Sequence, residues 1–239
     1  MSSTRQKGML ICFIGIDGSG KSTLSRYLYE VLKKSGYNVS YTWWLEGEDS
    51  LLRRVLRRIG KSKHLNLKCN DNTNSSKAVH KDKSIATKIF RALYPKIVLL
   101  DYLRFGIVKV WLPKIVNRNK IIIFDRFFYD VIIALSKEFD FPDAKREKLF
   151  KLYSKLLPNP DLIFIIDVPP EVSYLRKEEE IKSMGNAKAM WENYQELYSL
   201  VNRLSPGKRR IDNTGELGTV KAEILKATLD FLEANRNGK

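Results

Sequence analysis

The sequence reads Gly15-Ile16-Asp17-Gly18-Ser19-Gly20-Lys21-Ser22-Thr23 near its N-terminus, and this stretch decides the fold class. It fits the pattern G-x-x-x-x-G-K-[ST], which is typical of a loop that wraps nucleotide phosphates. The apolar residues Met9–Ile14 before it predict a buried strand. After it, Leu24, Leu28 and Leu32 recur at helical spacing. A strand, a glycine loop and a helix in this order predict that the chain binds a nucleoside triphosphate.

The residue types of this loop each suit phosphate binding. Glycines let backbone N–H groups turn inward around a phosphate, and the helix N-terminus adds partial positive charge. Lys21 is expected to reach the β- and γ-phosphates of ATP, and Ser22 is expected to hold Mg²⁺. The predicted ATP-binding residues are Gly15, Asp17, Gly18, Ser19, Gly20, Lys21, Ser22 and Thr23.

The rest of the chain predicts an α/β fold built on one parallel sheet. Apolar strand candidates alternate with helical stretches, which favours a three-layer P-loop NTPase fold with a five-stranded parallel sheet flanked by helices. The candidates are Met9–Ile14, Asn38–Trp44, Lys120–Phe124, Leu162–Asp167 and Arg209–Asp212. Residues 1–239 are predicted to form a single kinase domain, with a basic helical insertion at about 46–95 and a lid at about 169–188.

The insertion is expected to contain several elements. Ser50–Ile59 predicts an amphipathic basic helix, and Gly60–Lys83 is a polar stretch that predicts a loop. Ser84 is expected to cap a helix that runs toward Tyr94. Because Pro95 removes a backbone donor, a second helix is expected from there to Val116.

Charge is concentrated in residues 51–120, where 18 Lys or Arg face three acids and the local net charge is +15, nearly all of the +16 of the whole chain. Three interpretations stay open. The block is a solvated surface, a surface that attracts anionic lipid, or a surface that neutralises nucleic-acid phosphates.

The two cysteines lack metal-type spacing and no signal peptide is visible, so we expect a cytoplasmic protein, with a peripheral position at a membrane as the alternative.

Two further motifs make the sequence resemble thymidylate kinase and its relatives. About a hundred residues after the loop, a strand ends in Asp125-Arg126-Phe127, and Asp167-Val168-Pro169-Pro170 is similar to the family's entry to its lid. The aromatic helix Trp191–Tyr198 also has a counterpart in that family. The resemblance implies a nucleoside monophosphate kinase that uses ATP and Mg²⁺, and it suggests a homodimer.

The resemblance also implies roles for individual residues. Lys21 binds ATP phosphates and Asp17 faces the acceptor. Asp125 supports the metal together with Ser22, and Arg126 binds the phosphoryl groups. Arg104 is a candidate for binding the acceptor, and Arg176 is a candidate for a lid arginine that closes over ATP. The predicted catalytic residues are Lys21, Asp125, Arg126 and Arg176. The predicted acceptor-binding residues are Asp17, Arg104 and Arg126.

The acceptor half departs from that family's pattern. An arginine-proline motif usually follows the second strand, where this chain reads Thr42-Trp43-Trp44-Leu45-Glu46. After Asp-Arg-Phe, the family has a segment that contacts thymine, and this chain has Phe128–Ala134 there instead. Trp43 and Trp44 suit base stacking, although paired tryptophans at a strand end more often belong to the core. Phosphoryl transfer from ATP to dTMP is the predicted reaction; the alternative is another acceptor, such as a nucleic-acid end or a membrane-associated phosphorylated substrate.

Overall fold

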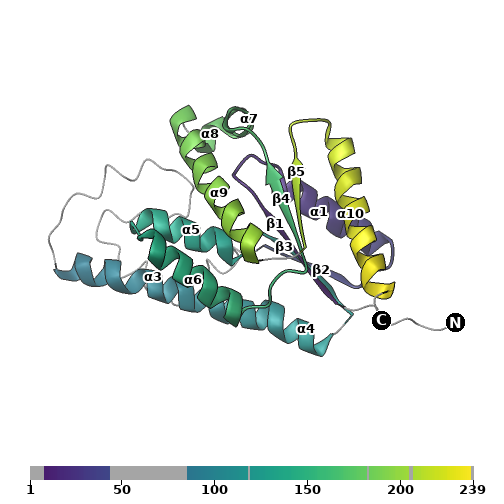
Figure 1. Cartoon of the computed structure of the whole chain (residues 1–239), viewed down its shortest axis with the longest axis horizontal. Coiled ribbons are helices and arrows are strands. Elements are labelled where there is room, and N and C mark those ends of the chain that lie inside the picture. The colour runs from purple at the N-terminus through teal and green to yellow at the C-terminus, as the bar shows by residue number, and fades with distance from the viewer. Residues whose placement is uncertain (1–7, 44–84, 118, 182, 205–206, 238–239) are drawn as a thin grey trace.

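All five strands of the computed structural model form a single parallel sheet (Figure 1). The structure describes residues 8–43, 85–117, 119–181, 183–204 and 207–237. The strand order is β2-β3-β1-β4-β5. The bounds are β1 (Met9–Ile14), β2 (Val39–Trp43), β3 (Ile121–Asp125), β4 (Leu162–Asp167) and β5 (Lys208–Asp212). The predicted fold class is therefore confirmed, and each predicted strand lies within one residue of the observed one.

Helices cover both faces of this sheet, so the molecule has three layers (Figure 1). α1 and α10 lie on one face, and α3, α5, α6 and α9 lie on the other. The helices are α1 (Lys21–Lys34), α3 (Ile85–Gly106), the π-helix η3 (Ile107–Trp111), α4 (Leu112–Val116), α5 (Phe128–Glu138), α6 (Asp143–Leu156), α7 (Pro170–Arg176), α8 (Glu178–Ile181), α9 (Met184–Leu204) and α10 (Leu217–Asn237).

The central strand β1 is buried on both sides because its alternate residues enter two separate cores. Leu10, Cys12 and Ile14 pack into the core beneath α3, α5, α6 and α9. Residues between them, including Phe13, pack into the core beneath α1 and α10. The chain leaves β1 at the carboxyl edge of the sheet, which is where parallel α/β sheets place their ligands.

The expected break at Pro95 is wrong, because α3 runs through it without interruption. Tyr94, Val98 and Tyr102 are all buried and lie one helical turn apart, so the two halves of the helix pack against the same core. This shared packing outweighs the roughly 3 kcal/mol cost of a proline in a helix interior. The helix ends instead where η3 begins, after Gly106.

Some predictions lie outside the described residues. These are the basic helix Ser50–Ile59, the loop Gly60–Lys83, the Ser84 cap and Trp44. Of the insertion predicted at about 46–95, the structure describes only the part that begins α3, and the role of the basic block stays a prediction. Within the described part of the chain, no helix is both long enough and apolar enough to cross a membrane.

Candidate active site

The loop between β1 and α1 needs glycine at two positions. Gly18 and Gly20 have φ angles of 77° and 88°, in the left-handed region that favours glycine. A Cβ atom at Gly18 would lie 2.6 Å from the backbone oxygen of Ser173, and one at Gly20 would lie 2.5 Å from Asn213 Nδ2. The two glycines therefore serve both the turn and the close approach of neighbouring segments.

A cavity of about 520 Å³ opens at this loop, at the carboxyl ends of β1, β2 and β3. It brings together all four predicted catalytic residues, which lie far apart in the sequence. Its lining comprises Asp17, Gly18, Gly20, Lys21, Ser22, Thr23, Arg26, Tyr41, Trp43, Asp125, Arg126, Arg176 and Lys177. Most predicted loop residues are among them, while Gly15 and Ser19 are buried behind the lining.

Lys21 is buried at the base of this cavity and is held by the loop itself. Its Nζ donates to the backbone oxygen of Ile16 at 3.0 Å and to Asp17 Oδ1 at 2.9 Å. Burial lowers the pKa of Lys21, and the nearby Arg126 guanidinium lowers it further. For Asp17, burial alone would raise the pKa, but Lys21 and Arg126 together hold it well below its usual value. The carboxylate therefore stays charged between two cations.

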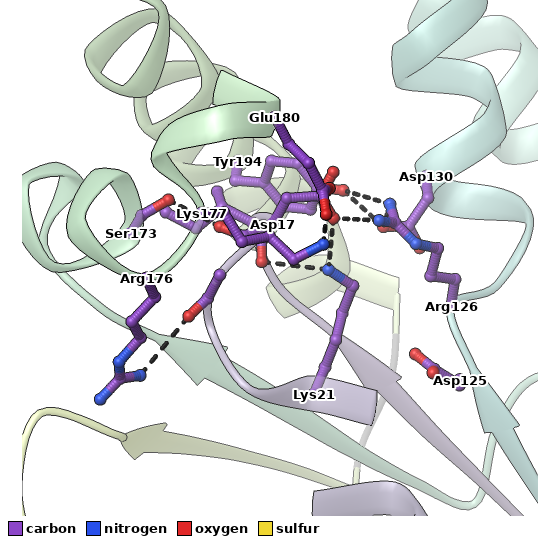
Figure 2. Close-up of polar contacts among 12 residues, drawn as sticks. Asp17, Lys21, Asp125, Arg126, Asp130, Ser173, Arg176, Lys177, Glu180 and Tyr194 are labelled. Atoms are coloured by element: carbon purple, nitrogen blue, oxygen red, sulfur yellow. Dashed lines mark hydrogen bonds and ion pairs between the residues drawn. The ribbon is translucent and has the colours of Figure 1, made fainter. Parts of the chain in front are cut away.

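Arg126 is the second cation on this carboxylate (Figure 2). Its φ of 70° is unusual for a residue with a side chain, and its backbone N–H donates to the Phe13 oxygen at 2.9 Å. The guanidinium donates from Nη2 to Asp17, and its Nη1 lies 3.5 Å from Tyr194 Oη and 3.9 Å from Asp130 Oδ1. The guanidinium thus reaches Asp17, the carboxylate that also binds Lys21.

Asp125 has the free acceptor that a metal site requires. Its carboxylate is buried, and Oδ2 accepts a hydrogen bond from Tyr41 Oη at 3.0 Å. Its Oδ1 has no hydrogen-bond partner among the described residues. Together with the Ser22 hydroxyl it offers the hard oxygen ligands that Mg²⁺ prefers, and Mg²⁺ takes few protein ligands because it keeps waters and phosphates. The residues fit the expected ion. In the described part of the chain, no three or more His, Cys, Asp or Glu side chains are grouped so that they could hold a metal ion by themselves.

The predicted lid segment is helical where the structure describes it, and it lies against the loop. Ser173 Oγ on α7 donates to the backbone oxygen of Asp17 at 2.6 Å. Arg176 donates from Nη2 to the Asn213 oxygen at 2.8 Å and from Nη1 to the Gly18 oxygen at 3.4 Å. Lys177 lines the cavity beside Arg176. The predicted position of Arg176 near the loop is thus observed.

Arg104 and Trp43 do not lie where the favoured interpretation of the sequence put them. The side chain of Arg104 is 72% exposed, pairs with Asp101 at 3.4 Å and does not line the cavity. Trp43 is 40% exposed and lines the cavity, so the interpretation of Trp43 as a core residue is wrong. The reason is that β2 is an edge strand, and Trp43 is its last residue.

Several residues at the site were missed from the sequence. Asn213 directly follows β5, and its buried side chain donates from Nδ2 to the Ser19 oxygen at 2.7 Å. Its place directly after a predicted strand, at the carboxyl edge of the sheet, could have indicated a site residue. The Tyr194 hydroxyl donates to Asp130 Oδ1 at 2.6 Å beside Arg126, and neither residue was assigned a role from the sequence, although Tyr194 lies in the aromatic helix Trp191–Tyr198. The others are Arg26, Tyr41 and Ser173, which stand on elements whose packing the sequence does not reveal.

No protein-family model matches the chain. Curated relatives do match it. A probable thymidylate kinase of Sulfurisphaera tokodaii is 26% identical over 195 residues, covering 78% of this chain and 80% of the relative. A probable thymidylate kinase of Archaeoglobus fulgidus is 26% identical, and the match covers 96% of this chain and 99% of the relative. The thymidylate kinase of Orientia tsutsugamushi is 28% identical and covers 75% of this chain and 69% of the relative.

The fold also has a counterpart among solved structures. The crystal structure of thymidylate kinase from Ehrlichia chaffeensis matches with a TM-score of 0.56 and 22% identity, covering 93% of this chain and 99% of that one. At this identity the match concerns the fold alone, and it agrees with the parallel five-stranded sheet. The sequence similarity to thymidylate kinases extends over most of the chain and confirms the resemblance drawn from its motifs.

Proposed function

We propose that this chain is an ATP-dependent nucleoside monophosphate kinase that converts dTMP to dTDP. The observation that carries the proposal is the cavity in which the phosphate loop, Lys21, Asp125 and Arg126 meet, in a chain similar to thymidylate kinases. All the relatives described above are named thymidylate kinases, so transfer to a nucleic-acid end or to a membrane-associated substrate is not favoured.

The reaction joins an oxygen of the acceptor phosphate to the γ-phosphorus of ATP, while the bond from that phosphorus to the β–γ bridging oxygen breaks and ADP leaves. Such transfer depends on positioning and on cations close to the transferring oxygens. Asp17 holds Lys21 and Arg126 side by side, so both cations already face the same space before phosphate arrives. Binding then requires that phosphate oxygens replace Asp17 as their partners.

The remaining residues prepare the donor. Ser22 and Asp125 would hold the Mg²⁺ of Mg·ATP, which supplies charge neutralisation at the phosphates. Arg176 and Lys177 line the same cavity as Asp125 and stand at the C-terminal end of the lid helix α7. Their position suits closure over bound ATP, which excludes water from the transfer. The homodimer implied by the resemblance is part of this proposal, and light scattering on the purified protein tests it.

The deciding experiment is a coupled ADP-release assay with a panel of nucleoside monophosphates. We expect dTMP to give the highest kcat/KM and the Lys21→Ala variant to be inactive with every acceptor. If no monophosphate causes ADP release while the protein still binds ATP, the proposed acceptor is wrong and the interpretation of the phosphate loop stands. Activity that requires RNA, DNA or anionic vesicles would instead support the alternative.

A further inference from the structure

Most cations that line the cavity are already bound by other groups of the protein. Lys21 and Arg126 both contact Asp17, and Arg176 donates to backbone oxygens of Gly18 and Asn213. These three cations surround the phosphate loop. They belong to the site described above.

Lys177 is engaged as well, since its Nζ lies 2.6 Å from Glu180 Oε2. The fifth cation, Arg26, has the neutral Tyr41 side chain as its hydrogen-bond partner. It lines the same cavity and is exposed, and among the described residues it forms no ion pair with a carboxylate. Its guanidinium carbon lies 6.0 Å from the centre of the Tyr41 ring. Arg26 therefore carries a charge that a ligand can use.

The fold places Arg26 on a definite side of the cavity. It follows Ser22 by four residues on α1, so the two side chains share one face of the helix. That helix packs on β2 and β3, which lie on one side of β1, while β4, the lid helix and β5 lie on the other side. Arg26 and the cations of α7 thus stand at opposite ends of the cavity, with the phosphate loop between them.

The neighbours of Arg26 form one wall. Tyr41 and Trp43 lie two residues apart on β2, so their side chains point the same way, and both line the cavity. The Tyr41 hydroxyl donates to Asp125 Oδ2 at 3.0 Å, which ties this wall to the end of β3. Trp43 is paired in register with Asp125.

We propose that Arg26 binds the phosphate of the acceptor nucleotide. The inference rests on the proposed function and specifies its second substrate site. On this side of the cavity Arg26 is an exposed cation in the same lining as Asp125, and it can receive the phosphate of an acceptor. A guanidinium suits this role because its planar fork donates two parallel hydrogen bonds to a phosphate. The Tyr41 ring supports the guanidinium, and the exposed Trp43 ring extends the wall.

The test compares Arg26→Ala, Arg26→Lys and Lys34→Ala, the last being an exposed cation at the far end of the same helix. With ATP saturating, Arg26→Ala should raise the KM for dTMP about 10- to 100-fold, the usual loss for a hydrogen bond to a charged group. Arg26→Lys should recover only part of this loss because it lacks the fork. Lys34→Ala should match the unmodified chain, and the KM for ATP should change less than about twofold in all three.

Unchanged dTMP KM in Arg26→Ala would overturn the inference, as would an equal rise in both KM values. If no monophosphate is a substrate, the proposed function fails and Arg26 is tested separately. Inorganic phosphate is then titrated into protein saturated with a non-hydrolysable ATP analogue, followed by calorimetry. Weaker phosphate binding by Arg26→Ala than by Lys34→Ala would support the phosphate site, and equal binding would overturn it.

Discussion

The two ends of the cavity are held in different ways. On the lid side, Ser173, Arg176 and Asn213 contact the phosphate loop mainly through its backbone, by hydrogen bonds of 2.6 to 3.4 Å. On the β2 side, Arg26 and Trp43 are exposed and only Tyr41 is tied to a catalytic residue. The proposed donor end is therefore held by hydrogen bonds to the loop backbone, whereas the proposed acceptor end is formed by side chains on β2 and α1.

The largest effect is expected at the residue that both ends share. Lys21→Ala removes the buried cation from the loop and leaves Asp17 with Arg126 alone. We expect kcat/KM to fall about 1000-fold with either substrate varied, the scale of losing a main electrostatic contact to the transition state. Steady-state kinetics measures the loss, and circular dichroism checks that the variant folds. A selective loss for ATP alone would show that Lys21 serves only the donor end.

The second prediction concerns the support of Arg126. Asp130 is buried, its pKa is raised by that burial, and it accepts from the Tyr194 hydroxyl at 2.6 Å. Tyr194→Phe removes the hydroxyl that lies 3.5 Å from Arg126 Nη1 and leaves Asp130 with fewer partners. We expect kcat to fall about 10- to 100-fold while the KM for ATP changes less than about threefold, because a displaced guanidinium affects the transfer more than donor binding.

The matched control for this prediction is Tyr198→Phe, one turn along α9. The Tyr198 hydroxyl is buried and has no hydrogen-bond partner among the described residues, so its removal should leave kcat within about twofold. Equal losses in the two variants would contradict the positioning role and indicate that α9 responds to any change of its tyrosines.

The third prediction isolates the donor end. Asn213→Ala removes the Nδ2 donor that lies 2.7 Å from the Ser19 oxygen, which leaves a buried carbonyl unpaired at a cost of about 1–3 kcal/mol. We expect the KM for ATP to rise about tenfold while the KM for dTMP stays unchanged. Thr214→Ala, at the exposed next position, is the control. A rise in the dTMP KM of equal size would mean that the two ends are not independent.

The difference between the two ends of the cavity also explains which features could be predicted from the sequence. The parallel sheet and the loop were predictable because each depends on a local pattern, apolar strands for the sheet and the glycine-lysine motif for the loop. The roles of Asp125 and Arg126 came instead from the resemblance to thymidylate kinases. Arg26 was not predicted as a cavity residue, and for Trp43 base stacking was only one of two interpretations. Their exposure toward the cavity depends on β2 being an edge strand and on the rotation of α1, which are set by packing between distant segments.

The smallest effect is expected at Arg104, which the resemblance assigns to the acceptor. Its side chain is 72% exposed, pairs with the buried Asp101 on its own helix and does not line the cavity. Arg104→Ala should therefore change the KM for dTMP less than about twofold at saturating ATP. A rise of tenfold or more would show that α3 reaches the acceptor during the reaction. The acceptor end would then include a residue that moves toward the cavity on binding, and Arg26 would share the acceptor phosphate instead of holding it alone.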